Sequence, residues 1–501
     1  METKVKIVMF NPQASPKMPY DGPPLSVLTA VSLLDLDRNE IKILDWHDPK
    51  ADERLAAECR NALIFGVTCM TGSQIGRMLK AAQIARGANP EIKIVCGGWH
   101  PTLMPEQTLT HELIDYIVLG QGPWSFRDLV ECIRKNELPV NVPGVGYKQD
   151  GKLFINPRPP IRDINEFPPT PYHLLDRYAD FLVETSYGKR VAYLLSSQGC
   201  PNDCYFCSEA AFHFRRWTAR PVEFMIDFIK NLKEKHQIDA VAIADSNFFV
   251  NEKRVAEFCR QMIPLQLRWG GTSSRSEQLA RYKDETWELM RDSGLFDIFL
   301  GVESARNETL RVMNKRNTIE DTLAVFPRAK KYGIRLQCSF VIGTPGVDIE
   351  EDFKADMAFI NKWRKSGCVA QFHMFSFTPY PGVPFLETAF KLGYEQPKTL
   401  DGWGKYDLHA DVAPWIPKKY PQITDQLSVY FMFLAGHARK VVKAVAPRSL
   451  HWLALPAERL MYHLSDFRVE HSFFAVPLEY KLLKFVLVHK DFFFGGKKLQ
   501  F

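Results

Sequence analysis

The stretch SSQGCPNDCYFCSEA, residues 196–210, places Cys200, Cys204 and Cys207 within eight residues. It follows directly on an apolar run that predicts a β-strand. The spacing C-x3-C-x2-C puts three thiolates on one short loop, and thiolates suit zinc or iron–sulfur centres. A structural zinc site normally has four protein ligands, and the chain has no second CxxC pair. The pattern therefore favours an iron–sulfur cubane with one open iron, and a zinc site or an inert loop are the alternatives.

The residues after the cysteine stretch alternate apolar runs with helix-period segments. The predicted strands are 191–197, 240–245, 267–274, 297–303, 336–343 and 369–377, and the predicted helices are 220–235, 252–262, 284–293, 319–332 and 350–365. Six such units fit a partial (β/α)6 barrel over 186–385, with its active site in loops at the carboxyl ends of the strands. The cysteine loop follows the first strand, so we expect it at the barrel mouth.

Residues 1–137 show a separate alternation of the same kind. Strands are predicted at 5–10, 41–46, 63–68, 92–97 and 116–120, with helical patterns between them. This order predicts an α/β domain with a doubly wound parallel sheet, whose ligand lies over the carboxyl ends of the strands. The segments after these strands are rich in Gly, Thr and Ser, so backbone could approach a ligand closely.

Two further regions differ in composition. Eight prolines between Leu138 and Pro171 predict an ordered linker or strap over 138–185, without regular helix or central strand. Residues 386–501 lose the alternation and predict a mostly helical, aromatic-rich extension. Its phenylalanines and lysines favour a capping subdomain, with an apolar pocket or an anionic membrane surface as the alternatives. These residues are Phe473, Phe474, Phe485, Phe492, Phe493, Phe494, Lys481, Lys484, Lys490, Lys497 and Lys498.

Charge and hydropathy argue against several classes of protein. The formal net charge is +6 and no polybasic block is present, so nucleic-acid binding is not expected. The longest apolar runs fall short of the roughly 20 residues that span a bilayer, and the first residues do not read as a signal peptide. The other seven cysteines are scattered singly, which is typical of a reducing compartment. We expect a cytoplasmic protein, with peripheral contact to the inner membrane face as a secondary hypothesis.

The segment GCPNDCYFC, with an aromatic residue directly before its third cysteine, resembles the signature of the radical S-adenosylmethionine (SAM) enzymes. In that family three such cysteines bind a [4Fe-4S] cluster, and SAM chelates the fourth iron. The family's partial (β/α)6 barrel matches the predicted one. Further similar segments are GTSSRSE (271–277), LGVESARNETLRVMNKRNT (300–318), SFVIGTPGVDIEED (339–352) and FTPYPGVPF (377–385). The resemblance implies SAM contacts at Phe206, Arg275, Glu303, Gly343, Pro345 and Gly346. A glutamate that ends a strand is also commonly a solvated residue or a salt-bridge partner.

The amino-terminal domain resembles the cobalamin-binding domain that precedes the barrel in one subgroup of these enzymes. The similar segments are residues 66–109 and DYIVLGQGP (115–123). The resemblance implies a cobalamin site formed by Asn11, Pro12, Thr68, Thr71, Ser73, Gly97, Gly98, His100, Gly120, Gln121 and Gly122. The position of Gln121 is usually acidic, which weakens one hydrogen-bond assignment.

One departure concerns the cobalt ligand. The D-x-H-x-x-G element that supplies a histidine in many cobalamin proteins is absent after the first strand, and DWHDPK (45–50) after the second strand lacks the glycine. We therefore predict cobalamin without a protein histidine on cobalt. His47 and His100 are the weaker alternatives, since a histidine in such a loop more often bonds or caps its neighbours.

The resemblance implies that a reduced cluster cleaves SAM to methionine and a 5′-deoxyadenosyl radical, which removes hydrogen from an unactivated carbon. The first hypothesis is a C-methyltransferase acting on a hydrophobic small molecule, such as a lipid or a tetrapyrrole. The second is an oxidative cyclase or rearrangement enzyme with the same cofactors and no methyl transfer. The third is a non-catalytic cobalamin or redox sensor. A flavodoxin- or ferredoxin-type protein is the implied electron donor, and no catalytic side chain is assigned.

Overall fold

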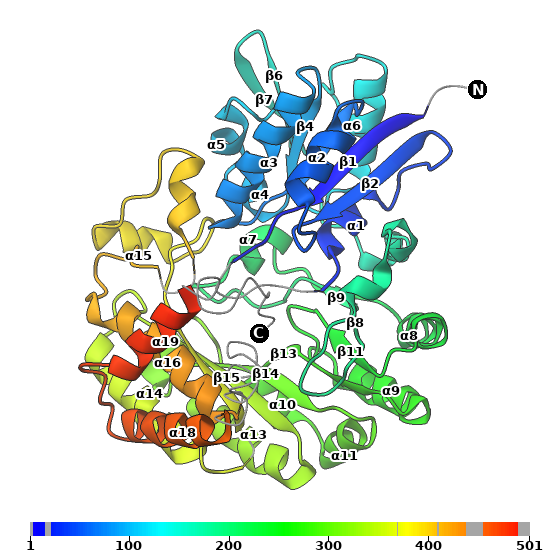
Figure 1. The fold of residues 1–501 in the computed structure, drawn as a ribbon. Coiled ribbons are helices and arrows are strands. Elements are labelled where there is room, and N and C mark those ends of the chain that lie inside the picture. The colour runs from blue at the N-terminus through cyan, green and yellow to red at the C-terminus, as the bar shows by residue number, and fades with distance from the viewer. Residues whose placement is uncertain (1–3, 16–21, 368, 408–409, 437–453, 489–501) are drawn as a thin grey trace.

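The computed structural model describes residues 4–15, 22–367, 369–407, 410–436 and 454–488. Figure 1 shows an amino-terminal α/β domain seated over the open end of a second, larger α/β domain, with the carboxy-terminal helices at the side of the latter. The predicted tail residues Lys490, Phe492, Phe493, Phe494, Lys497 and Lys498 lie outside the described residues.

The amino-terminal domain is built on a seven-stranded sheet in the order β2-β1-β3-β4-β5-β6-β7. The first five strands are parallel and confirm the five predicted ones: β1 (Val5–Asn11), β2 (Asn39–Asp45), β3 (Ile64–Thr68), β4 (Lys93–Gly97) and β5 (Tyr116–Val118). The helices between them are α1 (Leu25–Val31), α2 (Ala51–Cys59), α3 (Gln74–Ala88), α4 (Trp99–Leu103), α5 (Pro105–Thr110) and α6 (Pro123–Arg134). The strand order reverses between β1 and β3, which marks the place where a ligand binds in this architecture.

The proline-rich region departs from its prediction in its first half. β6 (Val145–Gln149) and β7 (Lys152–Ile155) form an antiparallel hairpin that extends the sheet, and β6 lies between two other strands. The expectation of no central strand is wrong here because residues 144–156 contain no proline, so their backbone N–H groups can join the ladder. The following residues contain only the short 3-10 turns η1 (Ile164–Glu166), η2 (Tyr172–Leu174) and η3 (Tyr178–Phe181), as the proline density predicts.

The barrel strands form two parallel sheets, β8-β11-β12 and β13-β14-β15-β16, which follow one another in chain order. Five predicted strands are confirmed as β8 (Val191–Leu194), β11 (Ala240–Ile243), β14 (Asp297–Glu303), β15 (Arg335–Ile342) and β16 (Val369–Ser376). The predicted strand 267–274 is divided into β12 (Arg268–Gly270) and β13 (Thr272–Arg275). Gly271 breaks it because its φ of 66° turns the backbone, and its N–H donates to Asp297 instead.

Helices cover the outside of the barrel strands. They are α8 (Val222–His236), α9 (Glu252–Met262), α10 (Ser276–Arg281), α11 (Asp284–Asp292), α12 (Asn307–Val312), α13 (Ile319–Tyr332) and α14 (Ile349–Trp363). Two additions lie near the cysteine loop: the short helix α7 (Glu209–His213) and the pairing of β9 (Ser197–Gln198) with β10 (Thr218–Ala219). Both were missed in the sequence because elements of two to five residues carry no periodicity.

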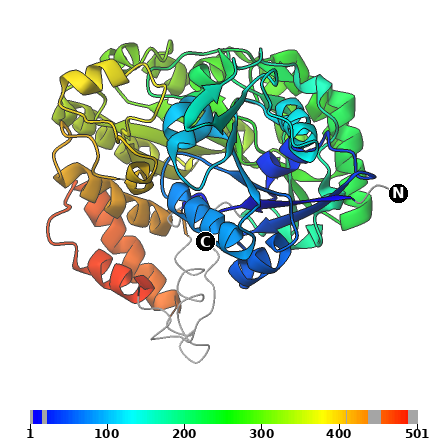
Figure 2. The ribbon, with the colours of Figure 1, turned by 90° about the horizontal axis from the view of Figure 1, so that it is seen from above.

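The carboxy-terminal extension is mostly helical, as predicted. Its helices are α15 (Leu386–Lys391), α16 (Lys419–Leu434), α18 (Ala454–Glu470) and α19 (Leu478–Val488). α16 packs against β16, and Figure 2 shows the orange and red helices α16, α18 and α19 gathered on one side of the barrel. In the described part of the chain, every helix is too short or too polar to cross a membrane.

Candidate active site at the domain interface

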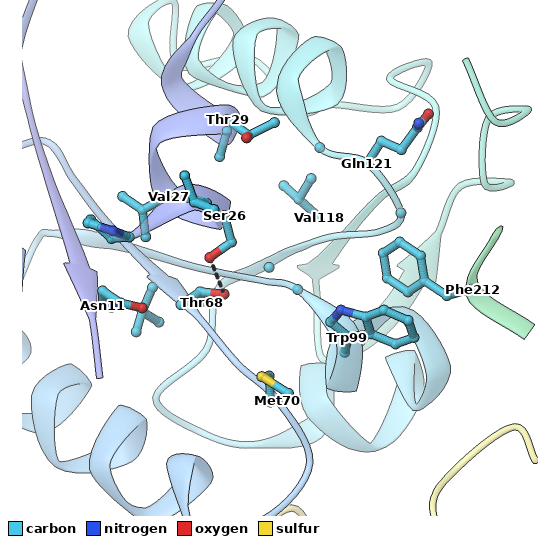
Figure 3. A pocket seen from close by; sticks show the side chains of 18 of the residues that line it. Asn11, Ser26, Val27, Thr29, Thr68, Met70, Trp99, Val118, Gln121 and Phe212 are labelled. Atoms are coloured by element: carbon cyan, nitrogen blue, oxygen red, sulfur yellow. Dashed lines mark hydrogen bonds between the residues drawn. The ribbon is translucent and has the colours of Figure 1, made fainter. Parts of the chain in front are cut away.

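A cavity of about 480 Å³ lies between the strand ends of the amino-terminal domain and the first loops of the barrel (Figure 3). One wall comes from α1 and from the carboxyl ends of β1, β3 and β4. The opposite wall comes from residues 195–199, from α7 and from the segment after β11. The predicted residues that line it are Asn11, Pro12, Thr68, Gly97, Gly98, Gly120, Gln121 and Gly122.

The walls are mainly apolar with few polar groups, as is usual for a cofactor pocket. Trp99 from α4 and Phe212 from α7 lie ring against ring, with 4.2 Å between centroids, and join the two domains (Figure 3). Near them Ser26 Oγ lies 3.4 Å from Thr68 Oγ1. Gln121 Nε2 donates to Gln198 Oε1 across the interface at 2.9 Å, so this departure from the family pattern has a structural role.

The end of β4 requires glycine. Gly98 has a φ of 108°, and a Cβ atom there would lie 2.8 Å from the carbonyl oxygen of Cys69. A larger residue would be strained and would push on backbone. The cavity wall at this point is therefore bare main chain that an occupant can approach closely.

Three predicted residues do not line the cavity. Thr71 Oγ1 lies 2.8 Å from His100 Nδ1, and Ser73 Oγ donates to the carbonyl oxygen of Ala14 at 2.9 Å. Burial lowers the pKa of His100 to about 4, so its imidazole is neutral. These side chains support the loops behind the cavity. His47, whose Nδ1 is bonded to Asp45 Oδ1, also lies outside the lining.

The cysteine loop begins just after β8 and faces the barrel mouth. Gly199, with a φ of 78°, starts it, because a Cβ atom there would lie 2.0 Å from the carbonyl oxygen of Arg216. Burial raises the pKa of Cys207 to about 12, and the neighbouring Cys204 and Cys200 thiols also raise this pKa. The described residues contain no group of three His, Cys, Asp or Glu side chains placed to hold one metal ion.

The donor set of the loop nevertheless fits a thiolate-bound cluster. Its three candidate ligands are all sulfur, and all come from one short loop. The buried Arg275 guanidinium donates to Cys204 Sγ at 2.8 Å and offsets the charge of a thiolate there. Asn247 Nδ2 lies 3.5 Å from Cys200 Sγ. The loop thus provides three thiolates, and β13 places a cation beside one of them.

A buried carboxylate fixes the base of this loop. Asp245, just after β11, accepts hydrogen bonds from the Ser196 N–H at 2.7 Å and from the Ser196 and Ser197 hydroxyls at 2.6 Å each. Burial raises the pKa of Asp245, and these hydrogen bonds act against that shift. Arg254 Nη2 donates to the Ser196 carbonyl oxygen at 3.1 Å. Asp245 ends the predicted strand 240–245, and a carboxylate at the end of an otherwise apolar strand is the signal in the sequence for this anchor.

Arg275 is a partner of the cysteine loop. It ends β13 as predicted, and it also pairs with Glu277 at 2.5 Å and donates to the Lys315 carbonyl oxygen. Burial acts to lower the pKa of Arg275, but Cys204 and Glu277 outweigh burial and raise it. The guanidinium therefore remains charged next to Cys204.

Glu303 is a buried salt-bridge partner, one of the two alternatives given for it above. Its Oε1 lies 2.9 Å from Lys315 Nζ, and Ser339 Oγ donates to Oε2 at 3.2 Å. Glu303 has a φ of 69°, which is strained for a residue with a side chain. Lys315 Nζ also lies 5.8 Å from the ring centroid of Phe206, the aromatic residue within the cysteine loop. The pair therefore connects the end of β14 to that loop.

The predicted SAM segment Gly343–Gly346 is covered by the carboxy-terminal extension. Trp415 Nε1 donates to the Gly343 carbonyl oxygen at 2.9 Å, and a Cβ atom on Gly343 would lie 2.2 Å from Ile416 Cδ1. Pro345 is buried, while Gly346 is exposed. The sequence contained no signal that residues more than 70 positions downstream would reach this strand end.

Two family models match the chain. Residues 194–360 match the radical SAM superfamily, and residues 16–130 match the B12 binding domain. The first match contains the cysteine loop and β14 to α14, and the second contains most of the cavity wall contributed by the amino-terminal domain.

Two curated relatives and one solved structure extend these matches. An uncharacterized methyltransferase of Pyrococcus horikoshii is 28% identical over 381 residues, covering 74% of this chain and 78% of the relative. The anaerobic magnesium-protoporphyrin IX monomethyl ester cyclase of Rubrivivax gelatinosus is 31% identical over 288 residues, covering 56% of this chain and 51% of the relative. The chain thus spans about half the length of the cyclase. The structure of OxsB, a cobalamin-dependent S-adenosylmethionine radical enzyme with aqua-cobalamin bound, aligns with a TM-score of 0.73 at 16% identity, covering 97% of this chain and 76% of OxsB.

Proposed function

We propose that the chain, which carries a radical SAM domain and a B12 binding domain ahead of it, is a cobalamin-dependent C-methyltransferase acting on an unactivated carbon. The observation that carries the proposal is the single cavity whose walls come from the strand ends of one domain and from the segments on both sides of the cysteine loop of the other. A reaction that uses both cofactors on one carbon needs their sites to adjoin.

The residues of the chain have distinct roles in this proposal. Cys200, Cys204 and Cys207 would hold a [4Fe-4S] cluster, and the strand end at Gly97 and Gly98 would lie against cobalamin. When bound, cluster and SAM supply a carbon-centred radical, and cobalamin carries the methyl group. The apolar and aromatic cavity walls would exclude water, which would otherwise quench reactive species.

A second candidate is an oxidative cyclase or rearrangement without methyl transfer. The cyclase relative favours it, because that relative is 31% identical to this chain and the Pyrococcus methyltransferase is 28% identical. Because the chain spans about half of that relative, we place this candidate second. Both candidates use the same cysteine loop and the same cavity.

The products of SAM distinguish the candidates. Anaerobically reconstituted protein would be supplied with cobalamin, SAM and either a chemical reductant or a flavodoxin or ferredoxin, which we propose as the electron donor. A methyltransferase should release S-adenosylhomocysteine as well as 5′-deoxyadenosine, whereas a cyclase should release only 5′-deoxyadenosine. Mass spectrometry of both products measures the outcome. Cys204→Ala is the matched control, because loss of the cluster should abolish 5′-deoxyadenosine and stop turnover, leaving at most one equivalent of S-adenosylhomocysteine from methylation of cobalamin. Absence of both products from the wild-type protein would contradict either enzyme.

We propose that the protein acts on a hydrophobic substrate in a reducing cytoplasm. Its carboxy-terminal helices would rest on the membrane surface from which the substrate is taken. Leu478, Leu482 and Phe485 recur at helical spacing on α19 and are 67%, 65% and 51% exposed. The lysines Lys481 and Lys484 are also exposed on this helix. Apolar side chains beside lysines are typical of helices that rest on anionic lipid. Cysteines scattered singly along the chain fit a reducing compartment.

Removal of the apolar face of α19 should abolish membrane binding. Leu478→Glu with Leu482→Glu places charge where lipid contact is proposed, so co-sedimentation with vesicles of anionic phosphatidylglycerol should be lost. Truncation before α18 is a poor test, because Val469 and Phe474 are buried in the core and the protein could unfold. Leu138→Glu is the control, since Leu138 is 42% exposed and belongs to the amino-terminal half. Equal sedimentation of all three proteins would contradict the membrane proposal.

Gly98→Ala should lower the cobalamin content of the protein. The new Cβ atom would lie 2.8 Å from the Cys69 carbonyl oxygen at a φ of 108°, a strain of about 1–3 kcal/mol in the cavity wall. Absorbance of bound cobalamin after gel filtration measures the effect. Gly87→Ala on α3 is the control, because nothing lies within 4 Å of its Cβ and it should stabilise the helix by up to about 1 kcal/mol. Equal cobalamin content in the two variants would argue against this wall as the site.

A further inference from the structure

A carboxylate and an imidazole form a pair in the otherwise mainly apolar cavity. Glu209 and His213 stand one turn apart on α7, and Glu209 Oε2 lies 2.5 Å from His213 Nδ1. Both line the cavity, and their side chains are only 12% and 10% exposed. Buried polar groups are costly unless they have partners, and His213 Nε2 is the one polar side-chain atom of the pair without a partner among the described residues. The sequence analysis did not single out either residue.

Several elements hold the pair in place. Ser246, which follows β11, donates to Glu209 Oε1, and the Trp99 ring lies 6.0 Å from the His213 ring. Arg158 from the strap donates to the carbonyl oxygens of Ala211 and Phe212, the last residues before His213. The ring of His213 is therefore fixed by the strap, the barrel and the amino-terminal domain together.

The orientation of the ring decides what it can bind. Because Nδ1 faces Glu209, the nitrogen left for the cavity is Nε2. When Nδ1 carries the proton given to the carboxylate, Nε2 is a hydrogen-bond acceptor. The charged groups around His213 are Glu209 on its own helix, Arg158 on the strap and Arg216, whose N–H donates to the His213 carbonyl oxygen. The ligand of Nε2 should therefore be a hydrogen-bond donor.

We propose that the Glu209–His213 pair would accept, at His213 Nε2, a hydrogen bond from the water ligand of bound aquacobalamin. The inference rests on the proposed function. Strand ends of the amino-terminal domain and α7 line opposite sides of this cavity, so His213 would adjoin a cofactor held there. A carboxylate at one nitrogen of an imidazole fixes its tautomer and strengthens the other nitrogen as an acceptor. The bond is to the water and not to cobalt, in keeping with the predicted absence of a histidine ligand.

The test follows the water ligand itself. Wild-type protein loaded with aquacobalamin is titrated with base, and absorbance reports its conversion to hydroxocobalamin. An acceptor next to a carboxylate favours the protonated ligand, so His213→Phe should convert at a pH lower by about one unit. His213→Gln keeps an acceptor and should shift less. His173→Phe makes the same change at an exposed position outside the cavity and should convert as the wild type does.

Three results would overturn the inference. Conversion of His213→Phe at the wild-type pH, with the same amount of cobalamin bound, would show that no such hydrogen bond exists. A nitrogen splitting in the electron paramagnetic resonance spectrum of wild-type cob(II)alamin, absent from His213→Phe, would show direct ligation instead. Failure of the wild-type protein to bind cobalamin at all would overturn the proposed function and this inference with it, and is recognised before any titration.

Discussion

Asp245→Ala should destabilise the protein by about 3–5 kcal/mol and remove most of its iron. The substitution deprives the Ser196 N–H and the Ser196 and Ser197 hydroxyls of their shared acceptor just before the cysteine loop. It also leaves the buried Arg254 guanidinium without its nearby anion. A loss of only about 1.4 kcal/mol at the loop would weaken cluster binding about tenfold. Thermal unfolding and iron content after anaerobic reconstitution measure the two effects.

The matched control, Asp239, flanks the same strand. Asp239 precedes β11 at the opposite end, is exposed, and accepts hydrogen bonds from the Lys189 and Arg190 N–H groups. Asp239→Ala should lower stability slightly and leave the iron content unchanged. If folded Asp245→Ala protein retained wild-type iron, the carboxylate would not be the anchor of the loop.

Lys315→Met should destabilise the protein by about 3–5 kcal/mol, because it leaves the Glu303 carboxylate buried without a counter-ion. The loss is aggravated by the position of Glu303, whose φ of 69° is held by the surrounding contacts. Gly301 leaves room for the pair, since a Cβ atom there would lie 2.5 Å from Glu303 Oε1 and 2.8 Å from Lys315 Nζ. The midpoint of chemical denaturation of the protein, followed by tryptophan fluorescence, measures the loss.

Two further variants separate burial from pairing. Glu303→Gln combined with Lys315→Met removes both charges and should recover most of the lost stability, because the remaining groups can be buried without a counter-ion. Lys354→Met breaks the exposed pair with Glu350, whose side chains are 70% and 61% exposed, and should cost no more than about 0.5 kcal/mol. A loss as large for Lys354→Met as for Lys315→Met would contradict the explanation by burial.

The sequence predicted the elements of the two domains well because each has a strong local period. The helices 252–262 and 319–332 were placed to the residue, since apolar positions recur on one face of each. The errors lie where a local rule was overridden. The hairpin of β6 and β7 formed within a proline-rich region, and Gly271 divided a strand that its apolar neighbours made continuous.

Some residues of the candidate site could be predicted from the sequence and others could not. The glycines at the end of β4 and the three cysteines were recognisable because backbone approach and thiolate ligation each depend on residue type and short spacing. The placement of Thr71, Ser73 and His100 behind the cavity was not recognisable. Whether a side chain after a strand faces the ligand or the loop behind it depends on neighbours such as Ala14 and Trp403, which are remote in the chain.

By itself the sequence determined the two α/β domains, their order, and the loop that carries three thiols, because hydrophobic period and ligand spacing act over a few residues. Only the tertiary structure decided which charges meet. Arg275 donates to Cys204, which lies 71 positions away in the chain, and Asp245 accepts from Ser196, which lies 49 positions away. Packing also brings Ile416 over Gly343. The physical reason is that a buried charge needs a partner wherever the packed chain can supply one, and sequence distance places no limit on that choice.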